Sequence, residues 1–145
     1  MILCQFEGGC MGCCKHRYKN RNKILEALEK NTFDLKISKT IEQFRDRAPR
    51  FQLRFGICMN AVMINEHVFC PLHAECNQGI DYREGYCSLD YFCGTAREFL
   101  NWNNQDRQKF LDFIKFKKLN PIEYSIKMYN GILLREFKKT LKKIN

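Results

Sequence analysis

The chain has 145 residues, which is the size of one ordinary domain, and 45% of them are hydrophobic. We therefore expect a single domain over residues 1–145 that buries its own core without covalent cross-links. No apolar run approaches the roughly 20 residues that span a bilayer, so we expect no membrane partner. The formal net charge of +9 would suit nucleic acid as a partner. However, a four-thiolate zinc site carries about −2, and two such sites would leave only about +5.

Nine cysteines are far more than an ordinary intracellular domain carries, and three explanations compete for them. Disulfides suit exported proteins, but residues 1–5 lack the apolar run of a signal sequence and the cysteine count is odd. Inert core thiols would explain Cys58, which lies in the apolar run 57–64, but not four cysteines within the first fourteen residues. Metal ligation accounts for this clustering and fits a reducing compartment, so we expect a cytoplasmic protein.

The first part of the chain begins with a cysteine loop. Residues 4–14 contain three glycines, which let the backbone turn tightly around a ligand. Apolar residues at helical spacing predict a helix over 22–31. A second helix is expected over 39–48, with Ser38 as its cap and Pro49 as its end.

The middle of the chain has a different pattern. Apolar and polar residues alternate over 51–55, which predicts a strand. Gly56 ends this strand, and the apolar run 57–64 is a candidate for a second strand that pairs with it. Residues 70–93 contain the second group of cysteines and show no sustained period, so we expect a loop there.

Residues 95–145 form a cysteine-free helical tail in this interpretation. Thr95 and Glu98 have the spacing of a capping box, which predicts a helix start. A break is expected near 103–104, and Pro121 suits the first position of a new helix.

The last segment, 132–144, has apolar residues on one side and lysines on or beside the other, as in an amphipathic helix. The expected fold is thus mainly α, with irregular cysteine-rich metal-binding loops at 4–14 and 70–93. It leaves room for a short two-stranded β element.

Cys10, Cys13 and Cys14 form a CxxCC motif. Two cysteines separated by two residues can hold one metal ion, because a tight turn brings both sulfurs to the same point. The adjacent Cys14 cannot easily point the same way as Cys13. It would therefore serve a second metal or a different corner of one cluster.

Further downstream, Cys70 precedes a Pro-Leu pair, and Cys87 and Cys93 enclose a segment that contains Leu89. Together with the CxxCC motif, this order of cysteines resembles the YkgJ family of cysteine-cluster proteins, which are proposed to chelate zinc or iron. The resemblance covers residues 4–93. It implies a metal or iron–sulfur site and assigns no definite biochemical role.

Two features depart from the family pattern. Glu7 stands where the family has its first cysteine, with Cys4 three residues earlier in its place, and the usual Arg-Pro pair is missing from 88–92. Whether Cys76 or His73 adds a ligand stays open. The predicted ligands are Cys4, Cys10, Cys13, Cys14, Cys70, Cys87 and Cys93.

The metal itself is not fixed by these spacings. The ferredoxin run C-x2-C-x2-C-x3-C-P is absent, and so is the pair of CxxC knuckles typical of structural zinc. The resemblance slightly favours an iron–sulfur cluster over zinc. An iron–sulfur cluster would imply electron transfer or a redox step, with an unspecified protein or small-molecule partner, and whether the protein is an enzyme stays open.

Two other functions deserve comparison with metal binding. A zinc-stabilised nucleic-acid-binding module could use the basic segment 15–21, with Tyr18 stacking on a base, although a solvated surface explains this segment better. A zinc deaminase would use His73 and Glu75 as its His-x-Glu pair, but the Pro-Cys-x-x-Cys element that this chemistry needs is absent.

Overall fold

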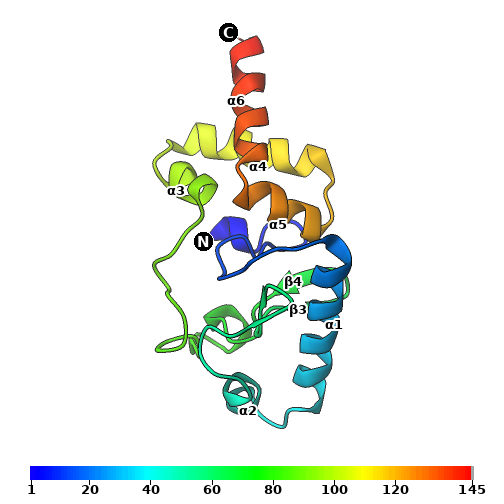
Figure 1. Ribbon diagram of the computed structural model, residues 1–145. Coiled ribbons are helices and arrows are strands. Elements are labelled where there is room, and N and C mark those ends of the chain that lie inside the picture. The colour runs from blue at the N-terminus through cyan, green and yellow to red at the C-terminus, as the bar shows by residue number, and fades with distance from the viewer. Residues whose placement is uncertain (145) are drawn as a thin grey trace. The chain divides into compact units, whose positions relative to one another are not determined.

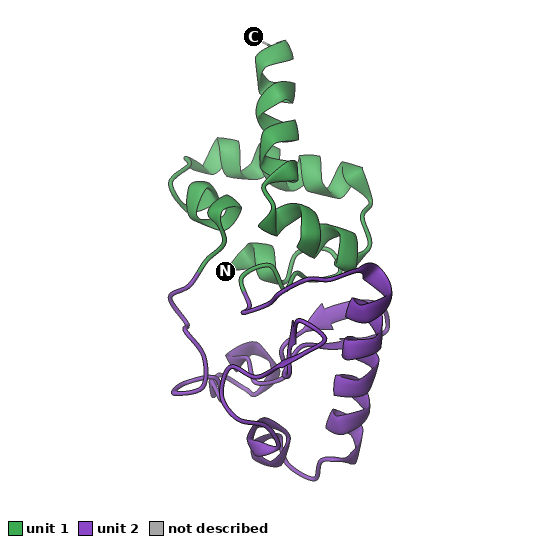
Figure 2. Ribbon diagram, in the orientation of Figure 1, with its two compact units in different colours: residues 1–13, 92–145 green, residues 14–91 purple. Residues whose placement is uncertain are grey.

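The computed structural model describes residues 1–144, which fall into two compact units (Figure 2). Unit 1 combines residues 1–13 with residues 92–144, and unit 2 comprises residues 14–91. The boundary therefore runs between the adjacent cysteines Cys13 and Cys14. Two units of this size are compatible with one folding domain or with two, so the single domain stays a prediction.

Helices take up about half of the described residues, which confirms the predicted mainly α class with a short β element (Figure 1). In the described part of unit 1 the elements are η1 (Ile2–Cys4), α3 (Gly94–Leu100), α4 (Asn104–Lys117), α5 (Pro121–Tyr129) and α6 (Ile132–Ile144). Those of unit 2 are α1 (Arg21–Ile37), α2 (Ile41–Asp46), β1 (Leu53–Arg54), β2 (Ile57–Cys58), β3 (Val62–Ile64), β4 (His67–Phe69) and η2 (Ala74–Cys76). Among residues 1–144, none of the helices combines the length and the apolar character needed to cross a bilayer.

Asparagine caps start two helices of unit 1 where the sequence predicts them. The side chain of Asn103 accepts a hydrogen bond from the backbone N–H of Asp106 at 2.9 Å, and α4 begins there. Asn120 accepts in the same way from Glu123 at 2.9 Å, and Pro121 follows at the first position of α5. Each cap satisfies a backbone N–H that has no partner within the helix. The predicted break and restart of the tail are confirmed.

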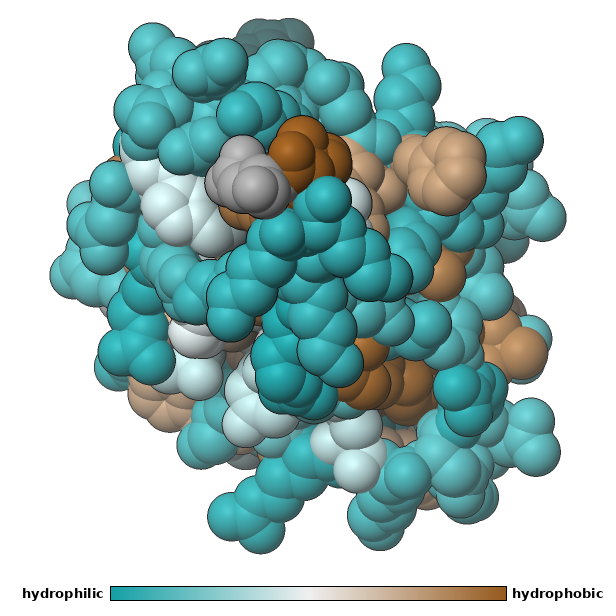
Figure 3. All heavy atoms as spheres, turned by 90° about the horizontal axis from the view of Figure 1, so that it is seen from above, coloured by the Kyte–Doolittle hydropathy of each residue, from teal (hydrophilic) through white to brown (hydrophobic). Residues whose placement is uncertain are grey.

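Aromatic side chains from α3, α4 and α6 form the core of unit 1. Phe99, Phe110 and Phe137 are buried, with Trp102 packed against them. The rings of Trp102 and Phe110 meet edge to face, with centroids 5.3 Å apart, a geometry that aromatic quadrupoles favour. The predicted amphipathic helix is confirmed as α6, which turns Phe137 inward and leaves its last-turn lysines exposed. Figure 3 shows the mainly hydrophilic surface seen from above.

The predicted capping box at Thr95 is wrong. Helix α3 begins at Gly94, one residue earlier, with Cys93 at the N-cap position. The buried hydroxyl of Thr95 donates instead to the backbone carbonyl of Met128 in α5, at 2.7 Å. A contact between two helices thus takes the hydroxyl that the local pattern assigns to a cap.

Both helices of unit 2 differ from prediction at their ends. Helix α1 starts after Asn20, whose side chain accepts from the backbone N–H of Lys23, and it extends to Ile37. Helix α2 is capped by Thr40 and not by the predicted Ser38. The hydroxyl of Ser38 donates instead to a carbonyl in the last turn of α1.

Two short hairpins pack beside α1. Strands β1 and β2 pair antiparallel, with Leu53 opposite Cys58, and Gly56 lies in the turn with φ +84°. This confirms the predicted pairing. The apolar run 57–64 is not one strand, however, because the chain turns after Cys58 and then forms β3, which pairs with β4. The second hairpin was not predicted.

Candidate metal centre

Four thiols from three segments of unit 1 gather at one place. Cys4 ends η1, Cys10 and Cys13 lie in the following loop, and Cys93 caps α3. The thiol of Cys13 is hydrogen-bonded to those of Cys4 and Cys93. The thiols of Cys13 and Cys93 also contribute to the raised pKa of Cys10. Burial raises the pKa of Tyr124, and all four of these thiols raise it further. We call this set the unit 1 thiol cluster.

Backbone contacts hold the segments of this cluster together. The N–H of Cys10 donates to the carbonyl of Cys4 at 2.8 Å, and the N–H of Cys93 donates to Sγ of Cys13 at 3.3 Å. The buried Tyr124 donates its hydroxyl to the carbonyl of Leu3 at 2.9 Å, next to Cys4. Helix α5 therefore positions the first cysteine of the cluster.

Gly12 allows the CxxC loop to lie flat against α5. A Cβ atom at this position would lie 3.3 Å from both Sγ of Cys10 and the carbonyl oxygen of Ser125. The neighbouring N–H of Met11 donates to the hydroxyl of Ser125 at 3.0 Å, which fixes the loop. The glycine thus has a packing role between the two cysteines of the motif.

Three thiols of the cluster, those of Cys10, Cys13 and Cys93, have raised pKa values. Burial raises the pKa of Cys10 to about 12, although the N–H of Gly12, 3.2 Å from its sulfur, opposes the rise. The hydrogen bond to Cys4 is the main cause that raises the pKa of Cys13 to about 11. The pKa of Cys93 is raised first by its hydrogen bond to Cys13 and then by burial. A bound cation would reverse this balance, because thiolates are the form that ligates metal.

The remaining predicted ligands, Cys14, Cys70 and Cys87, belong to unit 2. Burial raises the pKa of Cys70 and of Cys87, and the thiol of Cys58, which the sequence predicts as a core residue, raises both further. Its apolar neighbours Ile57 and Met59 are the reason why the sequence predicts a core residue at this position. The predicted ligand set is thus divided between the two units.

Cys76 and His73 do not join either group of thiols. Cys76 is exposed, and its sulfur donates to the backbone carbonyl of Cys70 at 3.7 Å. Nδ1 of His73 accepts a hydrogen bond from the N–H of Glu75 at 3.2 Å, which caps η2. Burial lowers the pKa of His73, and the nearby Arg83 lowers it further.

All nine cysteines lie in residues 1–144, and no disulfide joins them there. Within the same residues, no three His, Cys, Asp or Glu side chains have the mutual spacing of a formed metal site. The thiols of unit 1 contact one another through hydrogen bonds. A metal ion would require these side chains to turn toward a common point.

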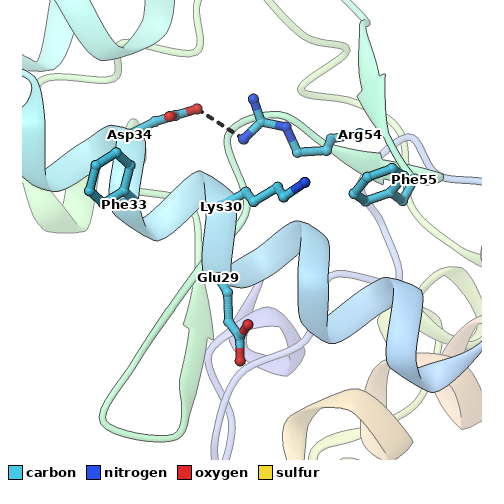
Figure 4. Close-up of a pocket in the computed structure, with 6 residues that line it drawn as sticks. All are labelled: Glu29, Lys30, Phe33, Asp34, Arg54 and Phe55. Carbon is cyan, nitrogen blue, oxygen red and sulfur yellow. Dashed lines mark hydrogen bonds and ion pairs between the residues drawn. The ribbon is translucent and has the colours of Figure 1, made fainter.

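A surface pocket beside α1 lies in unit 2 (Figure 4). Arg54 pairs with Asp34 across it at 2.9 Å, and Nζ of Lys30 lies 4.9 Å from the centroid of the Phe55 ring. Its lining contributes no thiol and no imidazole; the lining residues are Glu29, Lys30, Phe33, Asp34, Arg54 and Phe55.

The basic segment 15–21 shows no feature that is specific to nucleic acid. The ring of Tyr18 stacks on that of His16, with centroids 3.7 Å apart, so one face of the tyrosine is already covered. The ammonium group of Lys15 lies over the ring of Phe51. Nucleic-acid binding stays an untested alternative.

Comparison of the chain with protein-family models, with curated proteins and with solved structures found no match. The resemblance to the YkgJ family therefore stays a hypothesis that rests on the cysteine motifs.

Proposed function

We propose that this protein binds a thiophilic metal centre, a zinc ion or an iron–sulfur cluster, through the unit 1 thiol cluster. The observation that carries the proposal is the chain of hydrogen bonds from Cys4 through Cys13 to Cys93. Cys93 lies 80 residues from Cys13 in the sequence, and Cys10 lies beside them. Packing of an apolar core does not require four thiol groups at one position.

The donor set fits such a centre chemically. Zinc and iron–sulfur clusters are both held by four thiolates in their commonest sites. With a Zn–S bond of about 2.3 Å, tetrahedral geometry places two ligand sulfurs about 3.8 Å apart. Sulfurs in hydrogen-bond contact are already near this separation, so modest side-chain rotations would complete the site.

Backbone N–H groups around the cluster also suit thiolate ligands. The N–H of Gly12 points at the sulfur of Cys10, and that of Cys93 points at Cys13. The first N–H groups of α3, from Thr95 and Ala96, lie near enough to lower the pKa of Cys93 against the causes that raise it. N–H groups directed at ligand sulfurs stabilise their negative charge and tune the metal.

The two kinds of centre imply different roles. An iron–sulfur cluster, which the resemblance to the YkgJ family slightly favours, would give the protein a role in electron transfer or in a redox step. Zinc held by four thiolates would have a structural role, because no coordination position would remain open.

The test is metal and sulfide analysis, with a visible spectrum, of protein purified without oxygen. Cys13→Ser should lose the metal of unit 1, because Cys13 is the central thiol of the cluster. Cys76→Ser is the matched control, since Cys76 is exposed and belongs to neither group. Brown protein with acid-labile sulfide would identify an iron–sulfur cluster, and colourless protein with zinc would identify the other centre. Equal metal content in wild type and Cys13→Ser would refute the proposal.

A further inference from the structure

We propose that unit 1 binds single-stranded nucleic acid through a basic surface at the end of α4 and along the last turns of α6. We call this surface the unit 1 basic face, and its members are Lys115, Phe116, Lys118, Lys139 and Lys143. This activity goes beyond metal binding, because none of these residues belongs to the unit 1 thiol cluster. It also does not use the basic segment 15–21, which lies in unit 2.

The helical part of unit 1 carries an excess of positive charge. Residues 92–144 contain twelve lysines and arginines but only five aspartates and glutamates. The excess is greatest toward the end of this part, where residues 137–144 contain four lysines and no acidic residue. Such a surface attracts a polyanion, because each contact between a lysine and a phosphate releases condensed counterions.

An ion pair joins the two helices that carry the face. Nζ of Lys117, the last residue of α4, lies 2.7 Å from Oε2 of Glu136 in α6. Lys139 and Lys143 follow Glu136 by three and seven residues, so helical periodicity places them on the same side of α6. The last turns of α6 project beyond α4 (Figure 1), and the face therefore continues for about 10 Å past Glu136.

The four lysines of the face are available to a ligand. All four are exposed, and within residues 1–144 none of them forms an ion pair. Two neighbouring lysines differ in this respect, because Lys117 pairs with Glu136 and Lys138 pairs with Glu98. Phosphate binding at the face therefore breaks no ion pair of the folded protein.

Phe116 is the feature of the face that favours nucleic acid over other polyanions. Its side chain is 83% exposed, more than any other large hydrophobic side chain in residues 1–144. The other two phenylalanines of α4, Phe110 and Phe113, pack into the aromatic core. An unpaired base can stack on an exposed ring while flanking lysines hold the phosphates, as in proteins that bind single strands. A base inside a duplex has both faces covered, so we expect single strands to bind more tightly.

An anionic membrane offers the same phosphate chemistry, but α6 lacks an exposed apolar side that could enter it. Leu133 and Phe137 are buried in the core of unit 1, and Leu141 packs against them. Within residues 132–144, Ile144 is the only exposed large apolar side chain. A helix that lies on a membrane buries a whole apolar side among the lipids, which one residue cannot supply.

The test is fluorescence anisotropy of a labelled oligonucleotide of about 16 deoxythymidines, titrated with the full chain at low salt. Phe116→Ala should weaken binding by about 5- to 100-fold, which corresponds to one lost base stack. Phe33→Ala is the matched control, because Phe33 is 62% exposed in α1 of unit 2, and it should leave the affinity unchanged. Absence of binding, or an equal effect of the two substitutions, would overturn the proposal.

The salt dependence of binding tests the lysines separately. For single strands, the slope of log K against log salt concentration falls by about 0.7 for each phosphate contact that is lost. Lys143→Gln should therefore reduce the slope by about 0.7, whereas Lys36→Gln, at an exposed position of α1, should leave it unchanged. Equal slopes in the two variants would overturn the assigned surface. All four substituted side chains are exposed, so we expect each variant to fold.

Vesicles of phosphatidylcholine and phosphatidylserine distinguish the other source of phosphate. We expect the chain to bind the oligonucleotide more tightly than these vesicles at the same salt concentration. Binding to vesicles without binding to the oligonucleotide would overturn the proposal in favour of a membrane partner.

Discussion

The side-chain amide of Asn31 donates a hydrogen bond to the backbone carbonyl of Cys58 at 3.0 Å, across the interface between α1 and β2. The same amide bonds the carbonyl of Ala61 at 2.9 Å. Asn31→Ala would remove the side-chain donor of the buried Ala61 carbonyl, while the Cys58 carbonyl keeps the N–H of Ala61 at 3.1 Å, so we expect the free energy of unfolding to fall by about 1–3 kcal/mol. Urea denaturation measures it. Asn22→Ala, at an exposed site of α1, should stay within about 0.5 kcal/mol of wild type, and an equal loss in both would contradict the explanation.

Substitution of Gly56 and of Gly79 by Ala compares two causes of lost stability, a steric clash of the added Cβ atom and backbone strain. Both have positive φ, +84° and +93°, but a Cβ atom at Gly56 would lie only 1.9 Å from the carbonyl oxygen of Arg17. Nothing lies within 4 Å of the corresponding point at Gly79. Gly79→Ala should cost about 1–2 kcal/mol of stability from strain alone, and Gly56→Ala should cost clearly more or prevent folding. Thermal unfolding of both variants, compared side by side, is the measurement; similar melting temperatures would rule out the clash.

Asp34 makes the stability of unit 2 depend on pH. Burial acts to raise the pKa of Asp34, but hydrogen bonds from Arg47 and Arg54, at 3.0 and 2.9 Å, outweigh it and hold the pKa below its usual value. A lowered pKa contributes stability above the unfolded value of about 3.9, and this contribution is lost as the pH falls through the folded pKa.

We therefore expect Asp34→Asn to destabilise the protein most at neutral pH, and the difference from wild type to shrink below about pH 4. Urea midpoints measured across this range give the difference. Glu29→Gln, at an exposed position of the same helix, is the control and should show no such trend. A difference that stays constant down to pH 2 or grows on acidification would contradict the assigned ion pairs.

Tyr124 connects α5 to the start of the chain. Tyr124→Phe removes the buried donor of the Leu3 carbonyl and should lower the free energy of unfolding by about 1–3 kcal/mol. Because Leu3 adjoins Cys4, the variant should also release bound metal from unit 1 more readily in competition with a chelator. Tyr91→Phe, at an exposed site, should change neither quantity. Unchanged stability of Tyr124→Phe would show that the hydrogen bond contributes little.

Local signals in the sequence predicted several elements well. The break near 103–104, the restart at Pro121 and the amphipathic pattern of α6 depend on residues within one or two turns, so they can be recognised without a fold. The alternation around Gly56 likewise predicted the first hairpin. The capping box at Thr95 failed because its hydroxyl bonds a distant carbonyl instead.

The sequence by itself determined that the protein is mainly helical and rich in clustered cysteines, because composition and periodicity are local properties. Only the tertiary structure decided which cysteines lie together. It placed Cys93 beside Cys13, through a hydrogen bond that links residues 80 positions apart in the chain. No spacing in the sequence encodes this contact, since it depends on how the helices and loops pack.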